Sequence, residues 1–405
     1  MQYPCQRRRG KSFIYKRKII MSKILLVDTN FSSMPIYKSL VEMGHEVHVA
    51  GNNPLDTLGK ISNHYWNCDY SDVKKLSEVI EKSGADKLIA GCTDRSYESC
   101  SLVGAHHSWM GDNHENFCNI NNKSKLRNIL KFLDIPSPRV FSDIEQIAGF
   151  PVIIKPVDSY SGSGISLLRN PVASEIEQAR RIAKSVSKTN ECIIEEFVQG
   201  QLYSHSAFIR KENIVADFFV QEDCVASPFS VDTSKVVDGP GNEIIRKIRN
   251  SIARIIRHLN LSDGLMHTQF ICHENDYWII EITRRCPGDL YAILIELSTG
   301  FPYAKCYSSF FTGDEFNFMN DSSMRKNIMR HTLTPKIAGR MECIKFERPV
   351  CIERLVATKT AGDQLETGPK GRAGIVFLSE SNAEKLDQLY QMTLQGNLYN
   401  ISTFA

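Results

Sequence analysis

The sequence of 405 residues predicts a mixed fold, α/β in its first part and α+β in the rest, on the basis of three patterns. Near the start, two apolar strands flank an amphipathic helix, and such a β-α-β unit implies a parallel sheet. Residues 150–164 combine a short apolar strand, a lysine near its end and a loop of Ser and Gly. Later segments alternate apolar and polar residues between turns, which predicts antiparallel strands.

Residues 21–118 are predicted to form a Rossmann-like domain. The expected elements are strands at 23–28, 45–50 and 87–90, and helices at 34–43 and 73–82. The turn at 28–33 contains no glycine, so the dinucleotide fingerprint is absent and we expect no NAD binding. The loops at 28–33 and 92–97 follow the carboxyl ends of strands, where open α/β sheets bind ligands, so they are candidates for substrate contacts.

The rest of the chain combines helices with antiparallel strands. Helices are expected at 121–133, 173–187 and 242–259, the last with a stripe of isoleucines on one face. Strands are expected at 151–156, 191–198, 202–210, 214–220, 266–272, 277–282, 353–358 and 373–378. A hairpin joins the strands 266–272 and 277–282, and a basic turn at 368–372 precedes the last strand.

The composition is that of an ordinary globular protein with two to three domains, at 42% hydrophobic and 23% charged residues. The net charge of +3 is uneven, because residues 1–20 hold seven basic residues and no acid, which leaves 42 basic and 46 acidic residues elsewhere. This mildly acidic body gives no indication of a nucleic-acid surface. Residues 1–20 lack the apolar core of a secretory signal, so we interpret them as a disordered or upstream leader before Met21, with a weak targeting segment as the alternative.

The twelve cysteines form no CxxC pair and no Cys/His cluster with zinc spacing. Scattered thiols without a secretory signal predict reduced cysteines and a cytoplasmic location. No apolar run approaches the ~18 residues of a membrane-spanning helix, so we expect no membrane insertion.

Lys155 and the loop that follows carry the strongest chemical signal. An ammonium group at the end of a buried strand can reach an anion, and successive N–H groups of a small, flexible loop can form an anion-binding concavity. The loop contains Ser159, Ser161, Gly162, Ser163 and Gly164. These residues favour a phosphate site; the alternative is a hairpin turn beside a lysine whose stem lies along the surface.

Five pieces in this order resemble the ATP-grasp superfamily of carboxylate–amine ligases. They are Lys123, Lys155, the Ser/Gly loop, the segment 194–198 and the segment 281–285. The resemblance covers about residues 23–300 and implies a Rossmann-like domain at 21–118, an ATP-grasp domain at 119–310 and a C-terminal lobe at 311–405. Within the ATP-grasp domain it implies a small lobe, 119–198, and a core lobe, 199–310, which the small β-rich C-terminal lobe completes.

By this resemblance the chain binds ATP between the two lobes. Lys123 and Lys155 would neutralise the α- and β-phosphates, with Lys125 as a substitute for Lys123, and the Ser/Gly loop would close over the β- and γ-phosphates. Adenine would pair with the backbone of the hinge, which consists of Glu195, Glu196, Phe197 and Val198. For the two glutamates, the sequence alone favours a solvated strand end.

The resemblance also implies a Mg²⁺ site, with Mn²⁺ as the alternative ion. Glu281 would hold the ion, and Thr283 stands where the family usually has a second ligand. Arg285 matches the arginine that steadies the transferred phosphoryl group, so Arg285 and Lys155 are the predicted catalytic residues. The competing interpretation is a surface salt bridge between Glu281 and Arg285.

Two positions depart from the family pattern. Gln269 stands where the family places another metal-binding glutamate, and its neutral carbonyl would hold an ion more weakly. Leu202 replaces a glutamate that often binds the ribose.

The resemblance implies an ATP-dependent ligase that joins a small carboxylate to an amine through an acyl phosphate and releases ADP and phosphate. Two alternatives stay open. One is a degenerate ATP-grasp domain that binds nucleotide or a partner without catalysis, and the other is a kinase that phosphorylates a small carboxylate without ligation. The expected partners are small-molecule substrates, and a homodimer is compatible with the sequence.

Overall fold

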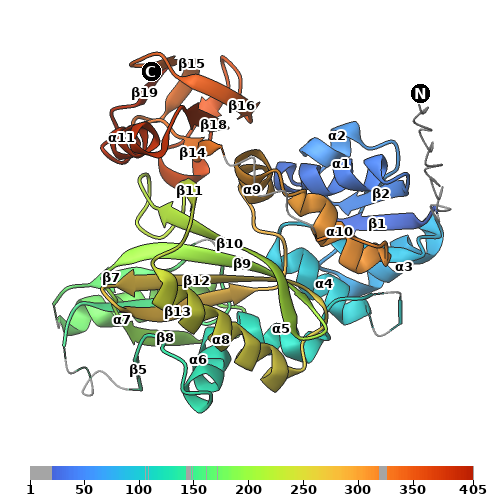
Figure 1. The fold of residues 1–405 in the computed structure, drawn as a ribbon, viewed down its shortest axis with the longest axis horizontal. Coiled ribbons are helices and arrows are strands. Elements are labelled where there is room, and N and C mark those ends of the chain that lie inside the picture. Colours follow the sequence, from blue (N-terminus) through green and yellow to red (C-terminus); the bar gives the residue numbers. More distant parts are fainter. Residues whose placement is uncertain are drawn as a thin grey trace, which may run out of the picture.

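A computed structural model of the protein describes residues 21–104, 106–107, 109–142, 147, 149–160, 162–170, 172–318 and 326–404. Figure 1 shows an α/β part at the N-terminal end, a body built on a large antiparallel sheet, and a separate lobe at the C-terminal end. The predicted fold class, parallel at the start and antiparallel afterwards, is confirmed. The predicted leader, 1–20, lies outside the described residues.

The N-terminal part is a four-stranded parallel sheet with the strand order β3-β2-β1-β4. Its strands are β1 (Lys23–Val27), β2 (Glu46–Gly51), β3 (Tyr65–Asn67) and β4 (Lys87–Ala90). Its helices are α1 (Met34–Glu42), α2 (Thr57–Ile61), α3 (Val73–Ser83) and α4 (Asp94–Val103), and a 3-10 turn, η1 (Phe31–Ser33), follows β1. The four apolar residues that end β1 are fully buried, as expected for a parallel strand covered by helices.

The helix predicted at 121–133 is α6 (Lys123–Phe132), and a further helix that was not predicted, α5 (His114–Asn121), comes directly before it. The break falls at Asn122, which has an extended backbone and whose side chain accepts a hydrogen bond from the N–H of Lys125. Asn is among the best N-cap residues, so it starts a new helix at this point.

The small lobe is an antiparallel sheet with the order β5-β8-β6-β7. Its strands are β5 (Val140–Phe141), β6 (Val152–Pro156), β7 (Ser166–Leu168) and β8 (Cys192–Glu196). Helix α7 (Ala173–Val186) packs on this sheet through three buried residues spaced three and four apart, Ile176, Ala179 and Ala183.

The core is an eight-stranded sheet with the order β13-β12-β9-β10-β11-β14-β18-β16. Five strands come from the predicted core lobe: β9 (Gln201–Arg210), β10 (Asn213–Asp223), β11 (Thr233–Val237), β12 (Gly264–His273) and β13 (Asp276–Thr283). Three come from the C-terminal segment: β14 (Asn327–Leu333), β16 (Cys351–Ala357) and β18 (Gly374–Glu380). Helix α8 (Asn242–Leu259) has the predicted bounds and buries its isoleucine stripe against residues of β9, β12 and β13.

The C-terminal lobe adds a three-stranded sheet of β17 (Gln364–Leu365), β15 (Gly339–Phe346) and β19 (Tyr399–Phe404). It also contains a 3-10 turn, η3 (Gly368–Lys370), and α11 (Ala383–Leu394). Strands β15 and β19 were not predicted, since β15 buries only two of its eight residues and its sequence shows little alternation.

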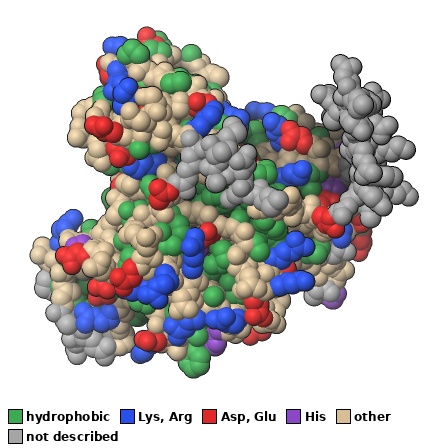
Figure 2. All heavy atoms as spheres, in the orientation of Figure 1, with side chains coloured by type: hydrophobic (Ala, Val, Ile, Leu, Met, Phe, Trp, Pro, Cys, Tyr) green, Lys and Arg blue, Asp and Glu red, His purple; other side chains and the backbone are tan. Residues whose placement is uncertain are grey.

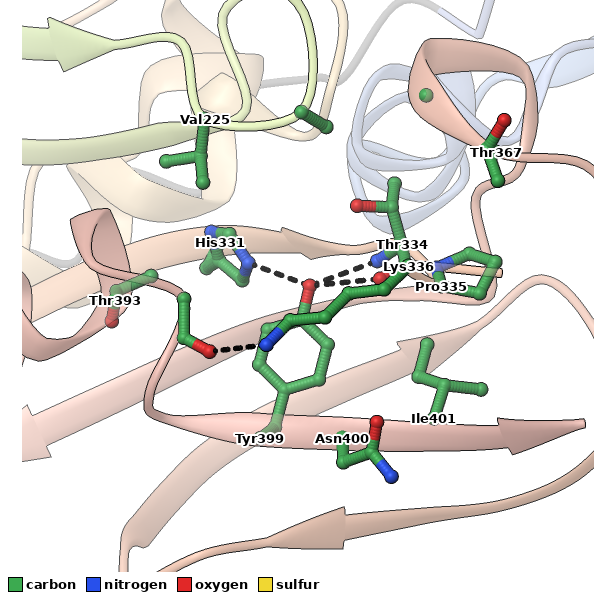
Figure 3. A pocket seen from close by; sticks show the side chains of 13 residues that line it. Val225, His331, Thr334, Pro335, Lys336, Thr367, Thr393, Tyr399, Asn400 and Ile401 are labelled. Carbon is green, nitrogen blue, oxygen red and sulfur yellow. Dashed lines mark hydrogen bonds between the residues drawn. The ribbon is translucent and has the colours of Figure 1, made fainter. Parts of the chain in front are cut away.

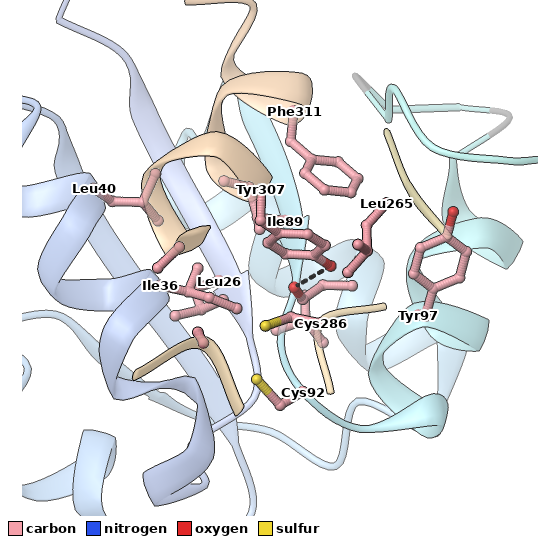
Figure 4. Close-up of a cluster of buried hydrophobic side chains, with 14 of the residues drawn as sticks. Leu26, Ile36, Leu40, Ile89, Cys92, Tyr97, Leu265, Cys286, Tyr307 and Phe311 are labelled. Carbon is pink, nitrogen blue, oxygen red and sulfur yellow. Dashed lines mark hydrogen bonds between the residues drawn. The ribbon is translucent and has the colours of Figure 1, made fainter. Parts of the chain in front are cut away.

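Helices α9 (Tyr291–Thr299) and α10 (Tyr303–Thr312) were also missed, because they are buried on most sides and therefore lack a one-sided apolar stripe. They belong to one apolar cluster that runs from the N-terminal sheet to the core sheet. Figure 4 shows Tyr307 of α10 donating to the carbonyl oxygen of Ala90 at 3.1 Å, and Cys92 and Cys286 pointing toward each other. The predicted domain boundary at residue 310 therefore falls inside α10.

Basic and acidic side chains intermingle on the face shown in Figure 2, where the surface is hollowed between the C-terminal lobe and the body below it. No helix in the described part of the chain combines the length and the apolarity needed to cross a membrane. The eleven cysteines of the described ranges are all free thiols.

Candidate active site

Lys155, near the end of β6, lies in a buried ion cluster. Its Nζ is 2.6 Å from Oε2 of Glu195 on β8, and Nε of Arg127 on α6 is 2.8 Å from Oε1 of the same glutamate. Burial lowers the pKa of Lys155, and Glu195 opposes this effect. Burial raises the pKa of Glu195, but Lys155 and Arg127 together outweigh burial and hold it below its ordinary value. Glu195 is therefore a buried partner that fixes Lys155, and its interpretation as a solvated strand end was wrong.

Arg127 also joins the small lobe to the core sheet. Its Nη2 donates to the carbonyl oxygen of Ile280 on β13 at 2.9 Å, one residue before Glu281. The sequence analysis missed Arg127, although it stands four residues after Lys123 and therefore shares a face of α6 with it. The contact joins the end of β13 to Glu195, the partner of Lys155.

The structure distinguishes Lys123 from its alternative, Lys125. The backbone N–H of Lys123 donates to the carbonyl oxygen of Val157 at 2.8 Å, which docks the start of α6 beside the end of β6. The buried Nζ of Lys123 donates to the carbonyl oxygen of Ser159 at 2.8 Å. Lys125 is exposed. Only Lys123 of this pair is thus held at the Ser/Gly loop.

The Ser/Gly loop needs its glycines for backbone reasons. Gly162 and Gly164 have φ of 73° and 74°, which L side chains rarely adopt. A Cβ on Gly162 would lie 2.6 Å from the carbonyl oxygen of Phe229, so the loop rests directly on the segment between β10 and β11. Ser163 accepts a hydrogen bond from Ser159 Oγ at its carbonyl oxygen, at 2.9 Å. Ser161 lies outside the described residues.

In the predicted hinge, residues 195–198, some polar groups already have hydrogen-bond partners among the described residues and others do not. Glu196 accepts a hydrogen bond from the backbone N–H of Arg139 at 2.9 Å, and the N–H of Phe197 donates to the carbonyl oxygen of Pro151 at 3.1 Å. Val198 makes no backbone hydrogen bond to another residue within the described ranges. Its backbone is therefore available for a ligand, although adenine binding stays a prediction.

The predicted metal ligands lie on paired strands. Gln269 of β12 and Glu281 of β13 are directly opposite each other in the antiparallel register. The carboxylate of Glu281 has no hydrogen bond or ion pair with any described residue. Gln269 Nε2 donates to Oε2 of Glu222 at 2.7 Å, a contact that the sequence did not indicate. Burial raises the pKa of Glu222.

Arg285 binds a residue of the N-terminal domain. Its Nη2 donates to Oδ2 of Asp94 at 2.7 Å, and Thr283 Oγ1 donates to Oδ1 of Asp94 at 3.2 Å. Burial lowers the pKa of Arg285, but Asp94 outweighs it and holds the pKa above its ordinary value. Arg285 Nε is buried without a hydrogen-bond partner among the described residues. The competing salt bridge from Arg285 to Glu281 is not formed. Asp94 lies within the segment 92–97, which was predicted as a loop near a substrate but whose residues 94–97 begin α4.

A second arginine cluster, which the sequence analysis missed, lies where the three parts of the chain meet. Arg330 on β14 donates through Nη1 to the carbonyl oxygen of Asp289 at 3.1 Å, and Arg372 Nη2 donates to Asp289 Oδ1 at 2.8 Å. The guanidinium of Arg372 lies 5.0 Å above the ring centroid of Phe31, in the 28–33 loop. Asp289 and Leu290 both have positive φ, at 56° and 59°, a strained conformation of the kind that clusters at functional sites. Two features of the sequence could have indicated this cluster, namely the loop after β13 and the basic turn at 368–372.

A cavity of about 320 Å³ lies between the C-terminal lobe and the segment after β10 that holds Val225 and Ala226, and no predicted site residue lines it. Figure 3 shows Tyr399 at its centre, with the hydroxyl oxygen 3.1 Å from Nε2 of His331 and 3.0 Å from the N–H of Thr334. Lys336 Nζ donates to the carbonyl oxygen of Gly396 at 2.9 Å. Burial lowers the pKa of His331 to about 3, so this imidazole is neutral near pH 7.

The donor set at the end of β13 suits a magnesium ion. Glu281 offers a free carboxylate, Gln269 a carbonyl oxygen and Glu222 a second carboxylate, and Mg²⁺ prefers oxygen ligands. Lys155 of the small-lobe sheet is thus connected, through Glu195 and Arg127, to the strand end of the core sheet that carries Glu281. Fold and site together resemble the ATP-grasp class.

Comparison with known proteins supports this assignment. Residues 148–292 match the family model described as the ATP-grasp domain, so the resemblance predicted from the sequence is confirmed. The D-alanine–D-alanine ligase of Fusobacterium nucleatum is 27% identical over 167 residues, which are 40% of this chain and 54% of that ligase. The chain spans about half or less of the length of the curated relatives that it matches first.

Two solved structures share the fold over almost the whole chain. Phosphoribosylglycinamide synthetase from Anaerococcus prevotii has a TM-score of 0.74 at 18% identity, covering 95% of this chain and 100% of its own. L-amino acid ligase from Bacillus licheniformis has a TM-score of 0.75 at 15% identity, with the same coverage. At these identities the likeness establishes the fold alone.

Proposed function

We propose that the protein is an ATP-dependent ligase that joins a small carboxylate to an amine through an acyl phosphate. The observation that carries the proposal is the cluster of Lys155, Glu195 and Arg127, which is anchored on the backbone one residue before Glu281. In this cluster Lys155, a proposed phosphate-binding residue of one lobe, is connected to the strand end of the other lobe that carries Glu281. The relatives named above are ligases or synthetases, which is consistent with this activity.

In this proposal Lys123 and Lys155 bind the phosphates of ATP, and Arg285 stabilises the phosphoryl group while it moves to the substrate carboxylate. The buried N–H of Arg285 Nε, without a partner among the described residues, supports a role as donor to a bound oxygen. The carboxylate oxygen attacks the γ-phosphorus and ADP leaves; the amine then attacks the acyl carbon and phosphate leaves. Positioning and charge stabilisation suffice for both steps, so the protein needs no side-chain nucleophile.

Glu281 and Gln269 are the proposed ligands of the Mg²⁺ that accompanies ATP. When bound, this ion would neutralise phosphate charge. Thr283 is a weaker candidate, because its hydroxyl already donates to Asp94.

The substrates are proposed to bind where Phe31 and Asp289 meet Arg330 and Arg372, with Asp94, the partner of Arg285, as a further candidate contact. Guanidinium groups suit a carboxylate and acidic groups suit an ammonium, so an amino acid or a small peptide fits this set. We also propose a cytoplasmic location, which is supported by the free thiols of the described residues, and a homodimer as the assembly.

The test is a screen of carboxylate and amine pairs with ADP release as the signal and mass spectrometry of the product. The proposal predicts ADP release that requires both substrates and a product with a new amide bond. Lys155→Met should abolish this signal by weakening ATP binding. An acyl phosphate formed without an amine-dependent product would identify the kinase alternative.

Gln269 and Leu202 favour a second candidate, a degenerate domain that binds nucleotide without catalysis. This candidate predicts ADP or ATP binding in calorimetry together with no ADP release for any pair of substrates. Leu202 pairs with Glu222 across β9 and β10, so a carboxylate remains near the position of the missing glutamate.

A further inference from the structure

Glu222 lies next to the position where a carboxylate is missing from the proposed metal site. Glu222 is on β10 and Gln269 is on β12, with β9 between them. Gln269 Nε2 nevertheless donates to Glu222 Oε2 at 2.7 Å, and Ser204 Oγ of β9 donates to Oε1 at 2.7 Å. The small side chain of Ser204, which pairs with Gln269, lets Glu222 reach across the intervening strand.

The same face of the sheet carries the other proposed ligand. Glu281 is directly opposite Gln269, and directly opposite residues of an antiparallel pair have Cβ atoms about 4.5–5.5 Å apart. Because Gln269 turns its amide N–H toward Glu222, its carbonyl oxygen points elsewhere and has no partner in the described chain. Glu281 and Gln269 therefore share one row of the sheet, which continues to Ser204 and Val220, and Glu222 lies on the same face two residues further along β10.

The charge of Glu222 has no direct counter-ion among the described residues. Its side chain is buried, with 3% of the residue exposed. The charge of Arg330 favours the ionised form of Glu222, but this guanidinium binds Ser234, on the strand beside β10, and Asp289 instead. A buried carboxylate without a cation is strongly unfavourable, so the arrangement suits a cation that the protein itself does not supply.

We infer that Glu222 supplies the carboxylate that Gln269 lacks, so that Glu222 and Gln269 together replace one metal-binding glutamate. Gln269 positions Glu222 through its amide and offers its carbonyl oxygen to the ion, while Glu281 provides the second carboxylate. This inference rests on the proposed binding of a metal–nucleotide complex.

The test uses Mn²⁺ with ADP on the full chain, because bound Mn²⁺ is counted directly by electron paramagnetic resonance. Glu222→Gln keeps the size of the side chain and removes its charge, and should weaken Mn²⁺ binding at least tenfold. The exchanged double variant, Glu222→Gln with Gln269→Glu, returns one carboxylate and one amide to the pair and should restore affinity to within about threefold. Glu274→Gln, at an exposed hairpin turn, is the matched control.

The single variant Gln269→Glu provides a second test, which remains valid even if Glu222→Gln does not fold. It places two carboxylates in contact, so its melting temperature should fall without metal and rise more with Mn²⁺ than that of the wild type. The inference is overturned if Glu222→Gln binds Mn²⁺ as tightly as the wild type does. It is also overturned if the exchanged variant binds Mn²⁺ as weakly as Glu222→Gln does. Failure of the wild type to bind either ADP or Mn²⁺ would instead overturn the proposed function, and this inference with it.

Discussion

Asp94 at the start of α4 binds Arg285 just after the end of β13, with Oδ2 2.7 Å from Nη2. The two residues are 191 positions apart, so the N-terminal domain orients the arginine of the core sheet. Asp94 also stands in the first turn of its helix, where a negative charge is favourable. The Rossmann-like domain thus contributes to the site through a charge, in addition to any substrate contact.

Arg285→Lys is expected to keep the fold and most of the affinity for ATP, because lysine can still pair with Asp94. It should lower turnover by about 10²-fold or more, since one ammonium cannot copy a planar fork that binds two oxygens in the transition state. Steady-state ADP release and calorimetric ATP binding give the two values. Normal turnover with unchanged ATP binding would make Arg285 only an ion-pair partner of Asp94.

Lys123→Met should raise the dissociation constant for ATP by about 10- to 100-fold, the loss expected for a charge-assisted contact of about 1.5–3 kcal/mol. Lys125→Met is the matched control, two residues away on the same helix but exposed, and should bind ATP as the wild type does. Calorimetry with ATP measures both. Equal losses in the two variants would contradict the assignment of Lys123.

Gly162→Ala should displace the Ser/Gly loop, because the added methyl group meets the carbonyl oxygen of Phe229 and the residue must keep a positive φ. We expect a strain of about 1–2 kcal/mol, seen as a raised KM for ATP with little change in global stability. Gly149→Ala serves as the control, since a Cβ there has no neighbour within 4 Å. An unchanged KM in Gly162→Ala would show that the loop does not contact ATP.

The contacts of Asp217, on β10, are expected to make the stability of the fold depend on pH in the acid range. Burial raises the pKa of Asp217, but hydrogen bonds from His205 and Arg249 outweigh it and lower the pKa from 3.8 to about 2. A lowered pKa stabilises the fold above the unfolded value, near pH 4, and this contribution is lost as the pH falls from about 4 to about 2. Asp217→Asn should therefore cost about 2 kcal/mol at pH 7 and lose less stability than the wild type below pH 4.

Urea unfolding at pH 7 and pH 3 tests this expectation, with the exposed Asp86→Asn as the control. Parallel losses for the wild type and Asp217→Asn on acidification would show that Asp217 does not carry the effect.

Much of the fold could be predicted because its elements carry local periodic signals. The isoleucine stripe of α8 gave that helix its correct bounds, and the alternation in β12 and β13 gave the hairpin. Helices α9 and α10 escaped prediction because they are apolar on several sides, and burial of that kind depends on neighbours from both the N-terminal and the core sheets.

The sequence by itself determined which residues are candidates for ligand binding: the lysines, the glycine loop, Glu281 and Arg285 all stand in one recognisable order. It did not determine which charges pair. Arg127 with Glu195, Asp94 with Arg285, and Glu222 with Gln269 are separated by 68, 191 and 47 residues. Local propensity carries no information about partners so far apart in the sequence, because only the packing of the three parts of the chain brings them together. In the low dielectric of the interior, each of these pairs then interacts more strongly than it would in water.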